Sequence, residues 1–267
     1  MKFGFIGTGN MGAALAAAAV KGLGGNNVML TNRTHAKAAA LAETLGCACG
    51  TNDQAVQKCD MVFLGVKPNM MADLLAQLAP MLAARSKPYT LVSMAAGLTI
   101  ARLQEMVGCA APIIRIMPNT PCQVGSGMIL YTASAQVSAD ALDVFLQGMA
   151  PAGRFDQLPE ALMDAGSAVS GCGPAFVYLM IEALADGGVA CGLPRQKAQD
   201  YAAQTLLGAA QMVLETGKHP GALKDAVCSP GGSTIQGVRA LEENGFRTAA
   251  FEAVIAAYQK TRDLGKA

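Results

Sequence analysis

The N-terminal part of the chain alternates between short apolar runs and longer stretches of helical character. The apolar runs, each of which predicts a strand, are 2–7, 27–32, 60–66, 89–94 and 111–117. The stretches between them, each of which predicts a helix, are 13–22, 34–46, 69–83 and 99–107. Apolar runs without polar alternation are typical of parallel strands that are buried on both faces. Together with the intervening helices they predict a doubly wound α/β domain.

The pattern changes after about residue 160, where helices replace the alternation. Five helices are predicted, at 174–191, 194–216, 220–228, 234–244 and 246–264. Helix 174–191 is apolar on nearly every side, with Glu182 and Asp186 as its only charged residues. Such a helix has to be buried. We expect a second copy of the chain to cover it, with a monomeric bundle around one central helix as the alternative. Two domains are predicted, 1–159 and 160–267.

The composition of the chain bears on which partners it binds and in which cell compartment it works. The net charge of +1 gives no electrostatic reason to expect a nucleic acid or a membrane surface as partner. The uncharged runs at 3–20 and 116–139 are interrupted by glycines or by prolines, so neither predicts a signal peptide or a membrane helix. The eight cysteines form no CxxC pair and the two histidines are far apart, so no metal site is predicted. Reduced, scattered cysteines favour a cytoplasmic protein.

A glycine-rich segment, Gly-Thr-Gly-Asn-Met-Gly at 7–12, joins the first predicted strand to the first predicted helix. In a GxGxxG loop the first glycine permits a tight turn and the second lets the backbone approach a pyrophosphate. The third lets the helix pack closely on the strand. The N–H groups at the helix start then favour the phosphates. This setting predicts a dinucleotide-binding domain of the Rossmann type.

The end of the second predicted strand decides which dinucleotide is expected. An NAD-preferring site places a carboxylate there for the ribose 2′-hydroxyl, whereas this chain has Asn32, Arg33 and Thr34. Without a carboxylate nothing repels a 2′-phosphate, and Arg33 offers a planar fork for it. The sequence therefore favours NADP(H) over NAD(H), with a solvated surface role as the alternative for Arg33.

Three further motifs follow the ends of later predicted strands, where doubly wound sheets bind ligands. They are Gly-Val-Lys-Pro at 65–68, Met-Ala-Ala-Gly at 94–97 and Met-Pro-Asn-Thr-Pro at 117–121. The small residues of the second allow the backbone to approach a flat cofactor. The prolines of the third make a stiff turn that aims Asn119 or Thr120 at a nicotinamide ring.

A second loop, Ser-Pro-Gly-Gly-Ser-Thr at 229–234, lies far from the first and carries no charged side chain. We expect Pro230 to end one helix and Ser233 and Thr234 to cap the next. A helix start with exposed N–H groups can hold an anion without a basic residue.

These motifs, together with Ser-Gly-Cys-Gly-Pro-Ala-Phe at 170–176 and Leu-Lys-Asp-Ala-Val-Cys before the second loop, resemble the pyrroline-5-carboxylate reductase family over essentially the whole chain. The resemblance implies reduction of L-1-pyrroline-5-carboxylate to L-proline, with hydride delivered to C5 from NADPH, or alternatively NADH. It also implies a helical domain that interlaces with its partner in a homodimer, and larger oligomers such as a decamer.

The resemblance also carries the family's contacts onto numbered residues. Cofactor contacts fall on Gly7, Thr8, Gly9, Asn10, Met11, Gly12, Asn32, Arg33, Thr34, Asn52, Val66, Lys67, Pro68, Ala95 and Ala96, to which the stiff turn adds Asn119. Substrate contacts fall on Gly231, Gly232, Ser233, Thr234, Glu160 and Asp225. Cys172 stands where the family usually has serine, and it is left out of the predicted site.

The substrate explains why no strong catalytic acid is apparent. A cyclic imine is basic enough to arrive protonated, so the enzyme has mainly to orient it. We expect the Thr234 hydroxyl to bond the ring nitrogen and the N–H groups of 231–234 to bind the carboxylate. Two rivals remain: a β-hydroxyacid dehydrogenase, whose required lysine is missing from 170–184, and a regulatory protein that senses NADP(H) without turnover.

Overall fold

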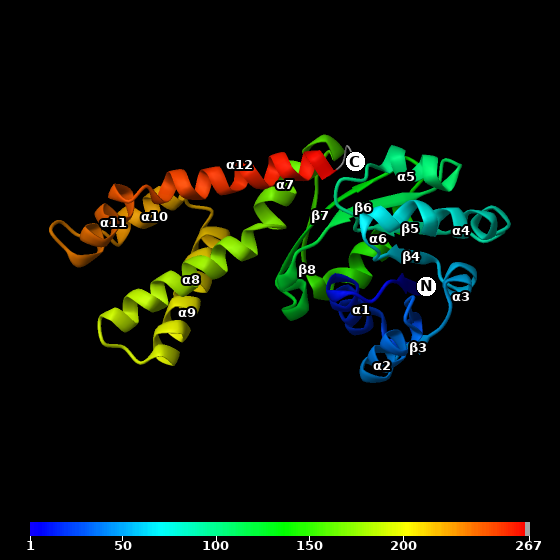
Figure 1. The fold of residues 1–267 in the computed structure, drawn as a ribbon, viewed down its shortest axis with the longest axis horizontal. Helices are drawn as coiled ribbons and strands as arrows, with labels where there is room; N and C mark the ends of the chain where they lie inside the picture. Colours follow the sequence, from blue (N-terminus) through cyan, green and yellow to red (C-terminus); the bar gives the residue numbers. More distant parts are fainter. Residues whose placement is uncertain (265–267) are drawn as a thin grey trace. The chain divides into compact units, whose positions relative to one another are not determined.

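The computed structural model describes residues 1–264, which form two compact units (Figure 1). The first unit comprises residues 1–172 together with residues 257–264. The second comprises residues 173–256. Each unit is described by itself.

The first unit is built on one twisted sheet. Among the described residues it has eight strands, in the order β3-β2-β1-β4-β5-β6-β7-β8. Neighbouring strands are parallel except for β6 and β7, which are antiparallel. The strands are β1 (Phe3–Ile6), β2 (Val28–Thr31), β3 (Ala48–Cys49), β4 (Met61–Leu64), β5 (Thr90–Ser93), β6 (Ile113–Met117), β7 (Gly127–Ala133) and β8 (Gly153–Gln157).

Helices cover both faces of this sheet, as the sequence pattern predicts. They are α1 (Asn10–Leu23), α2 (His35–Leu45), α3 (Asn52–Lys58), α4 (Met71–Ala83), α5 (Ile100–Val107), α6 (Ala139–Met149) and α7 (Met163–Ser170). One hydrophobic cluster joins Leu15 of α1 and Phe145 of α6 to Phe63 of β4. A second cluster joins Leu75 of α4 and Leu103 of α5 to the opposite face. Central strands buried on both faces explain the continuous apolar runs of the sequence.

The order of the strands brings the predicted cofactor motifs to one edge of the sheet. Strands β1, β2, β4 and β5 run parallel and in register, so their carboxyl ends lie side by side. The chain leaves each of these ends into a segment that the sequence singles out: 7–12, 32–34, 65–68 and 94–97. Open α/β sheets bind ligands at this edge.

The second unit is helical. It contains α8 (Gly173–Ala190), α9 (Arg195–Thr216), α10 (Pro220–Ala226), α11 (Ser233–Glu243) and the first part of α12 (Phe246–Leu264). Its buried hydrophobic cluster consists of Ala185, Ala198 and Ala202, where α8 and α9 pack together. A cluster of three alanines is a small core for a unit of this size.

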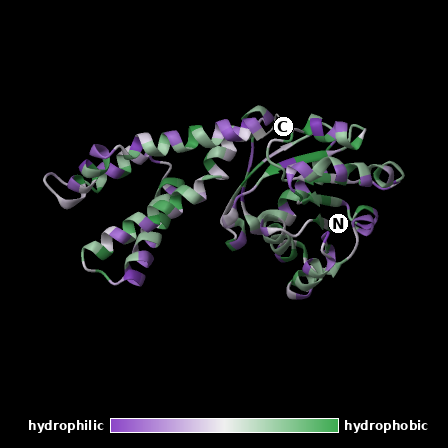
Figure 2. Cartoon of the chain, in the orientation of Figure 1, coloured by the Kyte–Doolittle hydropathy of each residue, from purple (hydrophilic) through white to green (hydrophobic). Residues whose placement is uncertain are grey.

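Large apolar side chains of α8 are therefore exposed in the single chain, and Figure 2 shows the hydrophobic colour along this helix. Tyr178 is 59% exposed and Leu179 is 67% exposed. The run 160–190 is long and apolar enough to cross a membrane, but only by length and composition. The core helix of a soluble protein, which is mostly buried, passes the same test, whereas 11% of this window is buried in the single chain.

The units divide between Cys172 and Gly173, thirteen residues after the domain boundary predicted at 159/160. The intervening segment, which includes α7, packs on the sheet instead of joining the helices. Met163 is fully buried in a cluster with Met117 of β6 and Leu130 of β7. Alternation of sequence pattern marks where strands end, but packing decides which unit a helix joins.

Candidate cofactor and substrate site

The glycine loop between β1 and α1 has the close backbone contacts that its sequence predicts. Gly7 has a φ of +100°, and a Cβ there would lie 2.6 Å from the carbonyl oxygen of Gly65. A Cβ on Gly12 would collide with the carbonyl oxygen of Gly7. Gly9, by contrast, faces open space. The first and third glycines are therefore required by packing, and the second leaves room for a ligand.

The start of α1 is open to an anion. Gly9 is the N-cap and provides no side-chain bond, and the first turn carries no acidic residue. The first N–H groups of a helix lack partners within it, and the helix dipole places positive charge there. The Thr8 hydroxyl, buried and without a hydrogen-bond partner among the described residues, lies in the same loop. A pyrophosphate oxygen fits such an orphaned donor, so the residues present suit a dinucleotide.

Asn32 links this loop to the end of β2. Its Oδ1 accepts a hydrogen bond from the Thr8 N–H at 3.5 Å, and its Nδ2 donates to the Thr34 carbonyl at 3.2 Å. Arg33 is exposed and makes no hydrogen bond or ion pair within residues 1–264. The Arg33 fork is thus free to meet a 2′-phosphate. Asn52, at the start of α3, accepts a hydrogen bond from the buried Thr31 hydroxyl at 2.6 Å.

The other predicted cofactor residues follow β4 and β5. Val66 is half-buried, and Lys67 and Pro68 are exposed at the start of a short 3₁₀ turn. Ala95 is 2% exposed, and its N–H approaches the Ser93 hydroxyl at 3.4 Å. A Cβ on Gly65 would lie 2.7 Å from the Gly7 carbonyl oxygen, so the segments after β1 and β4 are in direct contact. The structure thus brings these predicted residues to one edge.

Asn119 is 8% exposed, and its side-chain amide is engaged within the chain. Its Oδ1 accepts from the Met128 N–H of β7, and its Nδ2 donates to the Ser170 carbonyl of α7, both at 2.9 Å. These bonds tie the stiff turn to a strand and a helix. A contact between Asn119 and a nicotinamide stays a prediction.

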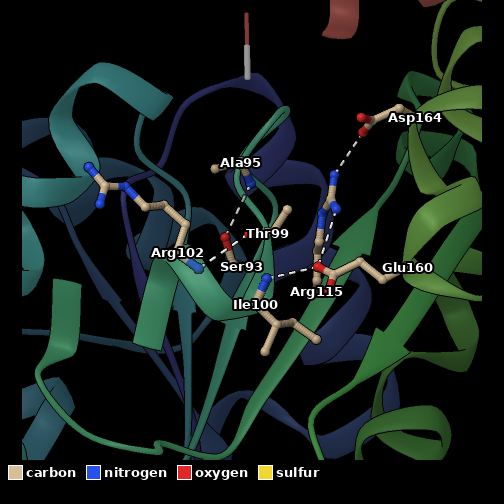
Figure 3. A network of polar contacts seen from close by, with 8 residues as sticks. All are labelled: Ser93, Ala95, Thr99, Ile100, Arg102, Arg115, Glu160 and Asp164. Atoms are coloured by element: carbon tan, nitrogen blue, oxygen red, sulfur yellow. Dashed lines mark hydrogen bonds and ion pairs between the residues drawn. The ribbon is translucent and has the colours of Figure 1, made fainter. Parts of the chain in front are cut away.

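A buried arginine forms a polar cluster with two carboxylates in this unit, which the sequence pattern did not predict. Arg115 of β6 is 1% exposed and donates to Glu160 at 3.3 Å and to Asp164 at 2.9 Å (Figure 3). The same oxygen of Glu160 accepts from the Ile100 N–H at the start of α5, at 2.8 Å. An arginine inside an apolar strand was the available signal, because a buried charge needs partners.

The second glycine loop lies in the helical unit, between α10 and α11. The N-cap of α11 is Gly232, and it makes no side-chain cap bond. The predicted capping by Ser233 and Thr234 is wrong: both residues lie inside the first turn of the helix and neither provides a cap bond. Gly231 has a φ of +70°, which favours glycine, and Gly232 donates to the Ser229 carbonyl at 3.1 Å.

The start of α11 is open to an anion. No side chain caps α11 and its first turn has no acidic residue, so no side-chain acceptor competes for the N–H groups at its start within the described residues. Ser233 and Thr234 are exposed. Asp225 of α10 is also exposed and pairs with Lys224 at 2.6 Å, a contact that raises the pKa of Lys224. Cys172, which precedes α8, donates its N–H to the Ser167 carbonyl at 3.1 Å.

The predicted residues thus fall in two groups. Those for the cofactor, together with Glu160, lie in the unit of residues 1–172, and those of 225–234 lie in the helical unit. The described residues contain no group of three or more His, Cys, Asp and Glu side chains that could hold a metal ion.

Comparisons with known proteins cover both units. A family model described as pyrroline-5-carboxylate reductase dimerisation matches residues 160–264, and one described as NADP oxidoreductase, coenzyme F420-dependent, matches residues 2–97. Pyrroline-5-carboxylate reductase of Escherichia coli is 41% identical, with 99% of this chain and 98% of that protein covered.

Two further relatives, which cover nearly the whole chain, are reductases of the same kind. The soybean (Glycine max) pyrroline-5-carboxylate reductase is 41% identical, over 98% of this chain and 95% of that protein. A crystal structure of Plasmodium falciparum pyrroline carboxylate reductase with NADP bound has a TM-score of 0.88 and 33% identity, over 99% of this chain and 98% of that one. Identity at this level over the full length shows descent from a common enzyme, and the chain belongs to the pyrroline-5-carboxylate reductase family.

Proposed function

We propose that this protein reduces L-1-pyrroline-5-carboxylate to L-proline, the final step of proline biosynthesis, with NADPH as the donor and NADH as an alternative. One observation carries the proposal: the Escherichia coli reductase aligns over 99% of this chain at 41% identity. The glycine loop at 7–12 and the loop at 229–234 both lie in a chain that matches such an enzyme from end to end.

The cofactor would be held by the sheet edge. The N–H groups at the start of α1 and the unpartnered Thr8 hydroxyl suit the pyrophosphate. Arg33, with Asn32 and Thr34, suits a 2′-phosphate, which favours NADPH. The segments 66–68 and 95–96 would line the nicotinamide half, and Asn52 the adenosine half. When bound, the nicotinamide supplies the hydride for C5 of the imine.

The substrate would be held by the start of α11. We assign its carboxylate to the N–H groups around 231–234, which have no side-chain cap, although that of Gly232 already donates to the Ser229 carbonyl. The Thr234 hydroxyl would bond the ring nitrogen and hold the iminium in line for hydride. Because the imine arrives protonated, no side chain has to donate a proton during the transfer; orientation is the enzyme's contribution. Asp225 would lie near the same site.

The assembly that we propose is a homodimer whose helical units interlace, with larger oligomers such as a decamer built from it. The exposed apolar side chains of α8 support a subunit contact. We further propose a cytoplasmic enzyme that binds neither nucleic acid nor membrane, because the net charge of +1 favours neither.

Thr234→Ala is the direct test. We expect kcat/KM for the imine to fall by roughly 10- to 100-fold, since one oriented hydrogen bond is lost, while the KM for NADPH stays unchanged. The measurement follows NADPH absorbance with L-1-pyrroline-5-carboxylate as substrate. Thr234→Ser retains the hydroxyl and should restore most of the activity.

Thr44→Ala removes an exposed hydroxyl of α2 and serves as the matched control, with no expected effect. Wild-type protein that oxidises no NADPH in the presence of the imine would refute the proposed reaction. Unchanged kinetics of Thr234→Ala would refute only the role of Thr234.

A further inference from the structure

The buried cluster of Arg115, Glu160 and Asp164 joins elements that are distant in the sequence. Arg115 lies in the middle of β6. Glu160 lies just before α7, and Asp164 lies in the first turn of α7. Arg115 is 1% exposed, while the side chains of Glu160 and Asp164 are 32% and 29% exposed. An arginine so deeply buried is stable only while its carboxylate partners remain in place.

Glu160 connects this cluster to the start of α5 through a hydrogen bond. One carboxylate oxygen accepts from both Arg115 and the Ile100 N–H. The Ile100 N–H is one of the helix-start groups that lack a partner within the helix. The positive end of the helix dipole stabilises a carboxylate there. Glu160 therefore acts as a cap for α5 that comes from sixty residues away along the chain.

The start of α5 in turn fixes the turn that precedes it. Only residues 94–99 separate the end of β5 from Ile100. Ser93 is paired with Arg115 in register on the neighbouring strand, and its hydroxyl approaches the Ala95 N–H. Gly97 has a φ of +76°. Figure 3 shows two separate sets of contacts, one between Ala95 and Ser93 and one from Ile100 through Glu160 to Arg115 and Asp164.

We propose that Arg115 is a positioning residue, which through Glu160 holds α5 and the 94–97 turn in the place that the nicotinamide half of the cofactor requires. The inference rests on the proposed function, in which Ala95 and Ala96 line that half. In this role Arg115 touches neither cofactor nor substrate, and Glu160, which the family resemblance places among the substrate contacts, acts through α5 instead. Asp164, the second partner, fixes the guanidinium so that its other nitrogen can reach Glu160.

Arg115→Lys and Glu160→Gln test this role. Arg115→Lys keeps the positive charge but loses the planar fork that reaches both carboxylates. Glu160→Gln keeps an acceptor for the Ile100 N–H but loses the charge that pairs with Arg115. In both variants we expect kcat to fall by roughly 10- to 100-fold, because a small displacement of a reacting group has that effect, with little change in the KM for the imine.

Binding of a cofactor fragment distinguishes a positioning role from a general loss of structure in the unit. NADPH should bind more weakly to both variants, whereas 2′,5′-ADP, which has only the adenosine half, should bind with unchanged Kd. Arg102→Gln is the matched control: it removes an ion pair with Glu105 on the same helix, but one whose side chains are exposed. Its kcat and both affinities should match those of the wild type.

Three results would overturn the proposal. One is unchanged kcat in both folded variants. Another is an equal loss of NADPH and 2′,5′-ADP binding, which would indicate loosening of the whole unit. The third is a raised KM for the imine with unchanged kcat in Glu160→Gln, which would make Glu160 a substrate contact. If Arg115→Lys fails to fold, Glu160→Gln decides alone.

Failure of the proposed function gives a different result. Wild-type protein without imine reductase activity would refute the reaction. The comparison of NADPH with 2′,5′-ADP would still decide whether the cluster positions the nicotinamide half.

Discussion

At the scale of single residues, burial changes the acidity of one cysteine, Cys59. Cys59, at the end of α3, is fully buried, and burial followed by the nearby Asp60 raises the pKa of its thiol to about 11 from an ordinary value of 9.0. The positive charges of Arg85, Lys2 and Lys58 act in the opposite direction but do not cancel this rise. A buried thiol of this kind is an apolar packing residue and not a nucleophile.

The raised pKa of Cys59 predicts a loss of stability at high pH. Between pH 9 and about 11 the unfolded chain releases the thiol proton while the folded chain keeps it. The free energy of unfolding then falls as pH rises, by at most roughly 1.4 kcal/mol per pH unit from this group. Urea unfolding of the wild type and of Cys59→Ala at several pH values measures the difference.

Cys59→Ala should lack this part of the slope, although the cavity lowers its stability at every pH. Cys191→Ala, at an exposed cysteine, is the control and should keep the wild-type slope. Parallel slopes for wild type and Cys59→Ala would contradict the prediction.

At the scale of elements, the helix starts differ in how they are capped. α3 begins with a complete capping box: the Thr51 hydroxyl accepts from the Gln54 N–H and the Gln54 side chain accepts from the Thr51 N–H, both at 3.2 Å. α1 and α11 begin with glycine caps and no side-chain bond. α2, α4, α7 and α9 also start without a side-chain cap bond, so the glycine N-cap is what distinguishes the two starts at which we place the anions.

Removing the cap of α3 should cost stability without affecting the substrate site. Thr51→Ala is expected to lower the free energy of unfolding by about 1 kcal/mol, and Thr51→Ser should retain most of it. Urea unfolding measures both variants. A stability of Thr51→Ala equal to that of the wild type would show that the box contributes nothing in this protein.

At the scale of the whole molecule, the helical unit has too small a core to be stable alone. Its buried hydrophobic cluster consists of three alanines, while large side chains of α8 and α9, such as Leu179 and Leu214, are 67% and 68% exposed in the single chain. Apolar exposure on this scale indicates a protein contact. The family model that matches residues 160–264 describes a dimerisation region.

A charge on α8 should therefore prevent assembly. We expect Leu179→Asp to sediment as a monomer, or to lose the fold of its helical unit, where the wild type sediments as a dimer or larger. Val124→Asp places the same charge at an apolar residue of the other unit that is 77% exposed, and it should leave the assembly unchanged. A dimer of Leu179→Asp as tight as the wild type would exclude α8 from the contact.

Local patterns alone determined much of this protein. The continuous apolar strands, the GxGxxG loop and the five C-terminal helices follow from periodicity and glycine placement, because these depend on residues that are near neighbours. The sequence pattern did not predict the elements of the segment 118–159, which are β7, α6 and β8. β8 is a half-exposed edge strand without a continuous apolar run. β7 has an apolar run at 128–131, but it reverses the direction of the sheet.

Tertiary structure alone decided the rest. That α7 packs on the sheet, that Gly232 rather than Ser233 caps α11, and that one oxygen of Glu160 serves both Arg115 and α5 all depend on contacts between residues far apart in the chain. The sequence showed an arginine in an apolar strand and two acidic residues after the last strand. Only the fold brings them together, because a buried charge takes whichever partners the packing places beside it.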